Sequence, residues 1–539
     1  MDPGMYPSSI TAEFSQSTKR TGVYLFSALV GTLAGLIIIL YRLSIAFLEQ
    51  SRANLLPLLA GNAGRILLWV AVASIMGVLT AMMVRKVPYI RGSGIPQVKA
   101  TLMRRIDPRW RLELPFKFLG GSLALGAGLS LGREGPSIQL GALVGKAISE
   151  LSRHKDYSRY LITAGAAAGI SAAFNAPLAG VLFCIEELHR NVSPVILTSS
   201  LIASFCANAV VWAFAGNAPV FGIILDSVLP LNHYFNSIVF IGISSALLGS
   251  LFNHGLLGFQ KAYKHLIPND AGRMVSAFAV AALVSLLVPA ISGGGDRLIE
   301  AVVHNDHGWR LISLLLLGKI GFTLFSYASG APGGIFLPML AIGALGGALS
   351  RLVFLEFDIG GEYLNNYVLI GMVGFFTAVV RAPITGAVLI TEMAGSFAHF
   401  PAFILVSVVA SIASELLRTK PIYDSLLGQI GADHPRETLS HPVVLHIPVQ
   451  EGSVLETCYN VQAHLPEGCI LVSVDHGEKE LFPDKELDIQ PGDTLRIVVE
   501  SRKAYLLKEK LLHLGEAPAA EQRDNERASR PVKNKRRIL

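Results

Sequence analysis

Five consecutive residues inside an apolar region, Gly132 to Pro136, place an arginine beside a glutamate. Proline favours the first position of a helix, where its missing N–H costs nothing, so we expect a helix to begin at Pro136. The backbone N–H groups just before that helix would lie at the positive end of its dipole, which is an anion-binding arrangement. Glu134 could occupy such a site itself or exchange places with another anion.

Three further stretches offer neutral hydrogen-bond donors. Ser93 stands between two glycines in Gly-Ser-Gly-Ile-Pro, which lets backbone approach a ligand closely, although the same pattern is typical of an ordinary turn. Residues 333–338, Gly-Gly-Ile-Phe-Leu-Pro, repeat the N–H-rich helix start without a charge. Tyr423 offers a phenolic hydroxyl near the end of the apolar region, where tyrosine also commonly anchors a membrane boundary.

Two adjacent acids, Glu186 and Glu187, follow an apolar stretch. A carboxylate near a membrane interface is costly and is often functional. Alternatively, Glu187 is an exposed helix-end acid that pairs with His189 or Arg190. The residues alone leave both interpretations open.

The composition indicates which elements position these groups. Of the 539 residues, 52% are hydrophobic and only 16% are charged, whereas about a quarter are charged in soluble proteins. Several apolar runs are long enough to cross a bilayer, and a polar N-terminal segment, 1–20, precedes the first of them. These runs are Val23–Tyr41, Ile66–Val84, Val195–Ala215, Ser237–Leu257, Val275–Ile291 and the region around Phe403–Ala413. We therefore expect a polytopic α-helical membrane protein without a cleavable signal peptide.

An internal repeat predicts how the helices are arranged. The pattern Gly-x-Glu-x-Pro-(x4)-Gly-Ala-Leu-x-Gly from Gly132 recurs from Gly334 with Phe in place of Glu, and Lys117 and Lys319 keep the same offset. A second match, from Asn175 and from Arg381, follows in order at a nearly equal offset. Duplicated membrane halves are often inverted, with broken helices meeting at mid-membrane. We expect two such halves, about 21–225 and 226–430, whose helix starts at Pro136 and Pro338 face one site.

The region after residue 440 has a different composition. Short β-rich runs at Val443–Pro448, Cys469–Val474 and Thr494–Glu500, with helical stretches at Ser453–Gln462 and Lys503–Leu512, predict a soluble α/β domain over 440–512. Residues 513–539 have a basic end and no apolar periodicity, which indicates a disordered tail. Lysine and arginine gather in loops near 85–86, 104–111, 153–159 and 418–420, so we expect these loops and both termini to be cytoplasmic.

Four motifs in this order resemble those of the CLC family of chloride channels and transporters. They are Gly-Ser-Gly-Ile-Pro from Gly92, Gly-Arg-Glu-Gly-Pro from Gly132, Gly-Gly-Ile-Phe-Leu-Pro from Gly333 and Lys-Pro-Ile-Tyr from Lys420. The resemblance covers about residues 20–430. It implies an all-α polytopic domain of short, tilted and broken helices in two inverted halves, with one complete pore in each subunit of a homodimer.

The resemblance also implies roles for individual residues. In this family a serine hydroxyl, here Ser93, and a tyrosine hydroxyl, here Tyr423, hold a central chloride ion. The backbone N–H groups that complete this site and line an external one belong to Ile335 and Phe336 and to Arg133, Glu134 and Gly135. The side chain of Glu134 gates the external site and carries the proton.

A second acid separates exchangers from passive channels in the family. Exchangers have a glutamate on the intracellular side of the proton path, and Glu187 falls on that position, whereas channels generally have an apolar residue there. The resemblance thus implies a proton–chloride antiporter of a bacterial inner membrane. A passive, voltage- or ligand-gated chloride channel of the same fold is the alternative. Ser93 indicates chloride, because relatives that select nitrate tend to have proline there.

The 440–512 domain resembles a TrkA-C domain, with the strand start Pro-Gly-Asp-x-Leu at Pro491–Leu495. Regulation by a small ligand is a hypothesis that names no residue. A cation or metabolite transporter is disfavoured, because paired acids are absent from the apolar runs. An enzyme is least expected, since no nucleophile–base pair, metal cluster or nucleotide-binding loop is present. No cofactor, metal ion or nucleic acid is expected, and the four cysteines lack metal-type spacing.

Overall fold

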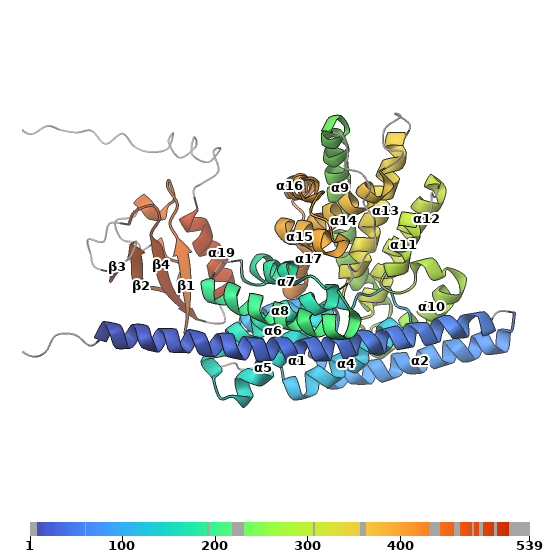
Figure 1. Ribbon diagram of the computed structural model, residues 1–539, viewed down its shortest axis with the longest axis horizontal. Coiled ribbons are helices and arrows are strands. Elements are labelled where there is room, and N and C mark those ends of the chain that lie inside the picture. The colour runs from blue at the N-terminus through green and yellow to red at the C-terminus, as the bar shows by residue number, and fades with distance from the viewer. Residues whose placement is uncertain are drawn as a thin grey trace, which may run out of the picture. The chain divides into compact units, whose positions relative to one another are not determined.

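The computed structural model describes residues 8–59, 61–190, 193–217, 231–304, 308–355, 363–430, 442–457, 464–476, 479–483, 489–500 and 504–516. The chain forms two compact units (Figure 1), a membrane unit that ends at Ile430 and a C-terminal unit that begins at Gly431. Each unit has its own hydrophobic core.

The first half of the membrane unit consists of helices joined by short turns and loops. Its elements are α1 (Ser8–Leu59), α2 (Ala63–Lys86), η1 (Pro88–Ile90), α3 (Ile95–Leu102), α4 (Trp110–Gly126), α5 (Glu134–Leu151), η2 (Lys155–Tyr157), α6 (Ser158–Phe174), α7 (Pro177–Phe183), η3 (Cys184–His189) and α8 (Pro194–Ala215). Proline stands in the first turn of α7 and α8, where its missing N–H leaves no helix hydrogen bond unmade.

The second half repeats this sequence of long and short helices. Its elements are α9 (Leu231–Leu266), α10 (Asp270–Leu287), η4 (Pro289–Ile291), α11 (Asp296–His304), α12 (Trp309–Ala328), α13 (Phe336–Leu355), α14 (Leu364–Val380), α15 (Pro383–Ala394), α16 (Phe400–Leu416) and α17 (Ile422–Leu427). In both halves the helix after the repeated Gly-x-x-x-Pro start packs closely on its successor, α5 on α6 and α13 on α14.

Glycine permits this close packing at equivalent places in the two halves. A Cβ added at Gly141 would overlap the carbonyl oxygen of Gly165, and one added at Gly343 would lie 2.7 Å from that of Gly371. The helix backbones therefore touch directly, as small residues allow in membrane helices.

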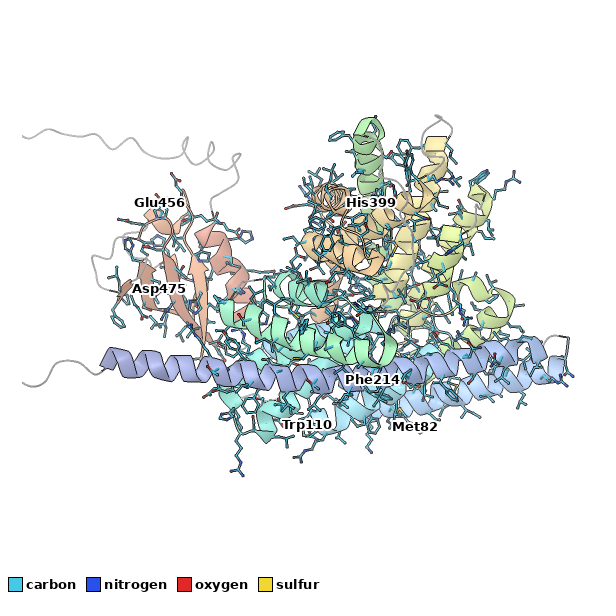
Figure 2. All side chains as sticks on the ribbon, viewed as in Figure 1. Met82, Trp110, Phe214, His399, Glu456 and Asp475 are labelled. Atoms are coloured by element: carbon cyan, nitrogen blue, oxygen red, sulfur yellow. The ribbon has the colours of Figure 1, made fainter. Side chains whose placement is uncertain are left out.

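The outer surface of the membrane unit is apolar. Seven helices are long and apolar enough to cross a membrane, among the described residues. Side chains such as Met82 and Phe214 (Figure 2) lie on their outer faces and are 55% and 67% exposed. The chain is a multi-pass membrane protein, as the composition predicts.

Two expectations about helix boundaries are wrong, and the N-terminal segment adds a finding that the sequence did not address. Helix α5 begins at Glu134 and not at Pro136, so the proline lies in the first turn, where N–H groups have no intrahelical acceptor in any case. The expected span Val275–Ile291 is split, because Pro289 ends α10 and begins η4. The N-terminal segment is helical from Ser8 and continuous with the first span.

The C-terminal unit is a four-stranded antiparallel sheet of order β1-β4-β2-β3 with a helix on one face. Its elements are β1 (Pro442–Pro448), η5 (Leu455–Thr457), β2 (Cys469–His476), β3 (Lys479–Leu481), β4 (Thr494–Glu500) and α19 (Ala504–Gly515). The buried side chains of Leu507 and Leu511 on α19 pack on the alternating inward residues of the strands. Glu456 and Asp475, labelled in Figure 2, belong to this unit.

The strands expected here are confirmed, and β3 is an addition. Of the expected helix Ser453–Gln462, only the short 3-10 turn η5 is formed within the described residues, and positions 458–463 lie outside them. Helix α19 extends to Gly515, past the expected domain end at 512. Residues 513–515 of the expected tail, 513–539, belong to this helix, and residues from 517 onward lie outside the described part of the chain.

Candidate functional site

The two repeated helix starts meet in the interior of the membrane unit. The N–H of Gly132 donates to the carbonyl oxygen of Gly334 at 2.7 Å, and the N–H of Gly334 donates back to Gly132 at 2.8 Å. This antiparallel pair fixes the backbone two residues before Glu134 and two residues before Phe336. Helices α5 and α13 therefore begin beside each other, as the repeat predicts.

The carboxylate of Glu134 lies where these two helix starts converge. Its side chain is fully buried, and its oxygens face the N–H groups of Glu134 itself and of Leu337, without a well-aligned hydrogen bond to either. A Cβ added at Gly132 would overlap its Oε2 atom and come within 3.0 Å of the Leu337 nitrogen. The carboxylate thus lies at two helix N-termini, where the helix dipoles favour a negative charge.

Arg133 partly screens this buried charge. Its Nε lies 3.8 Å from Oε1 of Glu134, and its guanidinium lies 4.0 Å from Oδ1 of Asp296 at the start of α11. The arginine side chain remains 19% exposed, whereas that of Glu134 is fully buried.

Two hydroxyl groups lie deeper in the same region. Ser93 and Tyr423 are almost completely buried, and neither hydroxyl oxygen has a hydrogen-bond partner among the described residues. A Cβ added at Gly135 would overlap Ser93 Oγ, which places the serine against the first turn of α5. Both hydroxyls can therefore donate to a ligand without giving up a hydrogen bond to the described protein groups. The burial of Tyr423 excludes its alternative as a surface anchor.

Aromatic rings enclose the start of α13. The ring of Phe336 lies 4.8 Å from that of Phe376 and 5.0 Å from that of Phe174. Phe183 lies between Phe336 and Tyr423, with ring centroids 6.2 and 6.5 Å away. Ile335 and Phe336 are themselves fully buried, so their backbone N–H groups lie in a dry, apolar shell that strengthens electrostatic interactions.

Glu187 lies on a short π-helix, η3, which buries three successive residues, Glu187, Leu188 and His189. Such π-helical turns often occur at functional sites. Its carboxylate is 2% exposed and accepts a hydrogen bond from the ammonium of Lys99 at 2.8 Å. The alternative of an exposed helix-end acid is therefore wrong.

Glu186, by contrast, faces away from this region. It accepts from the N–H groups of Ile384 and Thr385 at the start of α15, at 3.1 and 2.7 Å. Its repeat partner Glu392 accepts from the N–H groups of Leu178 and Ala179 at the start of α7, at 3.1 and 2.8 Å. Each half of the protein thus caps a helix of the other half, which is a structural role.

The repeated lysines are also structural anchors. Lys117 donates to the carbonyl oxygens of Ile90 and Gly92, at 2.9 and 2.7 Å, and holds the turn that carries Ser93. Lys319 donates in the same way to Ile291 and Gly293, at 3.2 and 2.7 Å. Neither lysine makes a direct contact with Glu134.

Sequence reasoning missed two features of this region. The turns after η1 and η4 are a third repeat, and the matching patterns Val-Pro-x-Ile-x-Gly-x-Gly from Val87 and from Val288 could have revealed it. The buried Lys99 and its second partner Asp424 were not singled out. A lysine in an eight-residue helix gives no sequence signal of burial, since its partners come from distant segments.

Comparisons with known proteins agree with this geometry. Residues 76–415 match the family model described as voltage gated chloride channel, and residues 461–512 match that of the TrkA-C domain. The chain is 34% identical over 445 residues to the H(+)/Cl(-) exchange transporter ClcA of Vibrio cholerae, covering 78% of this chain and 92% of the relative. It is 33% identical over 443 residues to the transporter of the same name from Vibrio vulnificus, with the same coverage.

Solved structures give the same fold. The crystal structure of a slow cyanobacterial Cl−/H+ antiporter matches with a TM-score of 0.73 and 29% identity, and covers 77% of this chain and 99% of that one. The crystal structure of a eukaryotic CLC transporter matches with a TM-score of 0.64 and 21% identity. The match covers 81% of this chain and 78% of the transporter's chain, and at this identity it shows only that the fold is shared.

Proposed function

Since the chain belongs to the voltage gated chloride channel family, also called CLC, we propose that it exchanges protons for chloride ions across a membrane and is a transporter, not an enzyme. One observation carries the proposal. The Glu134 carboxylate lies at the meeting point of two helix N-termini, in a position that a chloride ion would also favour. The exchange-transporter names of the relatives support the same conclusion.

The chloride path follows from the neutral donors. The hydroxyls of Ser93 and Tyr423 and the N–H groups of Ile335 and Phe336 replace the water around a central chloride ion. None of these groups carries a full positive charge, so the ion is held without being trapped. The N–H groups of Arg133, Glu134 and Gly135 line the external site.

Competition at the external site couples the two ions. Ionised Glu134 fills the position itself and excludes chloride. When the carboxylate takes up a proton it loses its attraction to the helix N-termini and leaves the position to chloride. Ionised Glu134 and chloride therefore compete for the same external site. Binding of a proton raises the affinity for chloride, and binding of chloride raises the affinity for the proton.

Glu187 accepts protons at the inner end of the path. Its burial and its position on the π-helix support this role, because an ionisable group held inside a membrane protein is costly and is usually functional. A passive channel would have no need for an acid at this place.

Flux into sealed vesicles tests the proposal. A chloride gradient should drive protons uphill with the wild-type protein, and Glu134→Gln and Glu187→Gln should each abolish proton movement while chloride still moves. Glu186→Gln is the matched control, since the neighbouring acid caps α15, and it should keep the coupling. Chloride flux without uphill proton movement in the wild type would show that the protein is a passive channel.

We extend the proposal to location and assembly. The basic loops support an orientation with both termini in the cytoplasm of a bacterium, within its inner membrane, among membrane lipids. A homodimer, as the resemblance to the family implies, is part of the proposal. The match of residues 461–512 to the TrkA-C domain supports a regulatory role, with a small molecule as a possible ligand.

A further inference from the structure

A buried ion cluster lies at the inner end of the path, beyond the residues used so far. The ammonium of Lys99 contacts Oε1 of Glu187 at 2.8 Å and Oδ1 of Asp424 at 2.6 Å. Lys99 and Glu187 are each 2% exposed and Asp424 is 16% exposed. The other carboxylate oxygen of Asp424 pairs with Arg190. Two acids thus share one buried lysine.

The charges of this cluster balance only while Glu187 is ionised. Two carboxylates then face one ammonium and one guanidinium. When Glu187 takes up a proton, the cluster gains one positive charge, and an unpaired buried ammonium would be strongly destabilising. Asp424 prevents that outcome, because it already holds Lys99 at a hydrogen-bonding distance. The lysine therefore opposes the protonation of Glu187 without forbidding it.

The charged and titratable groups that face Glu187 come from several elements. Helix α3 supplies Lys99, and α17 supplies Tyr423 and Asp424. The segment of Glu187 itself supplies Arg190 and His189. Helix α7 has no ionisable side chain, as its sequence Pro-Leu-Ala-Gly-Val-Leu-Phe shows.

The remaining neighbours of this segment are already engaged. On α6, Thr163 Oγ1 lies 2.7 Å from Nε2 of His189, and Arg159 lies 3.4 Å from its Nδ1. Across the path, Glu134 and Glu187 both lie near Tyr423. Lys99 is in direct contact with Glu187, at 2.8 Å.

The lysine also joins the two elements that carry the chloride-binding hydroxyls. Helix α3 begins two residues after Ser93, and Asp424 directly follows Tyr423 on α17. The Lys99–Asp424 contact ties these two short helices together. A change of partner by Lys99 thus acts next to both hydroxyls.

We propose that Lys99 is a positioning residue for proton transfer, which favours the ionised form of Glu187 and keeps its ion pair with Asp424 when the proton arrives. It thereby sets the pH range in which exchange operates. This inference rests on the proposed function, since it assumes that Glu187 accepts protons. It predicts opposite effects for the two partners of the lysine: loss of Lys99 makes Glu187 easier to protonate, and loss of Asp424 leaves the lysine to Glu187 alone.

The test is chloride flux and proton flux of the full-length protein in vesicles, with the same pH on both sides across a pH series. Lys99→Met should move the midpoint of the pH profile up by about one to two pH units, the usual effect of an opposite charge in direct contact. Lys99→Arg should restore the wild-type midpoint, and Asp424→Asn should move it down. Lys146→Met is the matched control, because that lysine is also buried and pairs with acids outside the cluster, Asp107 and Glu150.

A double-mutant cycle assigns the shift to Glu187. In the Glu187→Gln background, Lys99→Met should leave the pH profile of chloride flux unchanged. A purely structural lysine would lower proton and chloride flux in equal proportion with an unmoved midpoint, and that result would overturn the inference. If Lys99→Met does not fold, the pH profile of Asp424→Asn tests the inference. A midpoint that does not move down in that variant would overturn it. If wild-type protein moves chloride without protons, the proposed function fails instead, which is a different result.

Discussion

Gly132 and Gly334 exchange two backbone hydrogen bonds, with N···O distances of 2.7 and 2.8 Å. This pair joins the two halves of the membrane unit at the point where both broken helices begin. It leaves no room for side chains, and the space that a Cβ would fill at Gly132 is taken by the carboxylate of Glu134. Backbone atoms therefore surround the Glu134 carboxylate at this point, so adding even one methyl group should displace it.

Gly132→Ala should displace the Glu134 carboxylate from its position beside the two helix starts. The backbone of Gly132 is not in a conformation reserved for glycine, so the effect is steric, and such overpacking typically costs about 1–3 kcal/mol. We expect about a tenfold or greater loss of protons moved per chloride while chloride flux continues. Paired flux measurements check this. Gly258→Ala is the control, because nothing lies within 4 Å of a Cβ at that position. Unchanged proton coupling in Gly132→Ala would show that a side chain at this position does not displace the Glu134 carboxylate.

Ser93→Ala and Tyr423→Phe should weaken the binding of chloride at the central site. Each change removes one hydroxyl donor to a charged ligand, which is worth about 1.5–3 kcal/mol, or roughly tenfold or more in affinity. Calorimetric titration with chloride measures it. Tyr367→Phe is the control, since the hydroxyl of Tyr367 bonds to Ser237 at 2.8 Å. Equal losses in all three variants would show that the hydroxyls act on folding.

Lys117→Met and Lys319→Met should separate stability from binding. Each leaves two buried carbonyl oxygens without a donor, so both should lower the stability of the protein in detergent by about 1–3 kcal/mol. Only the turn held by Lys117 carries Ser93, so only Lys117→Met should also weaken chloride binding. Thermal unfolding and titration on the same samples give both quantities. A loss of affinity in Lys319→Met would contradict this division.

Glu392→Gln and Glu186→Gln should destabilise the protein without uncoupling it. Each carboxylate caps two backbone N–H groups of a helix in the other half, and loss of a cap costs about 0.5–2 kcal/mol. Glu186 also accepts from the hydroxyl of Thr385, at 2.6 Å, so its loss should cost more. Melting temperatures in detergent check the order, with the exposed Glu300→Gln as the unaffected control.

Removal of residues 440–539 should leave basal exchange intact. The core of the C-terminal unit is separate from that of the membrane unit, so neither core loses a side chain when the other is removed. Flux of the truncated protein measures this, and a comparison of its regulation with that of the full chain tests the role of the domain. Loss of all flux in a truncated protein that still assembles would show that the domain is part of the transport machinery.

The sequence predicted the parts of the site that depend on local backbone chemistry. The glycines and prolines around Glu134 and Phe336 set helix starts, and their repetition predicted that the two starts meet. Ser93 was likewise marked by its glycines. Boundaries were less certain, because Pro136 is tolerated anywhere in a first turn. The pairing of Glu187 with Lys99 was not predictable, since it joins side chains 88 positions apart and depends on a π-helical turn.

The exchange of helix caps between Glu186 and Glu392 bears on how such a protein could arise. One half alone has an acid with no helix to cap and a helix start with no acid to cap it. Two copies of that half satisfy each other completely, so a single-length ancestor would have worked only as a pair. Joining two such copies into one chain would keep this contact within a single molecule.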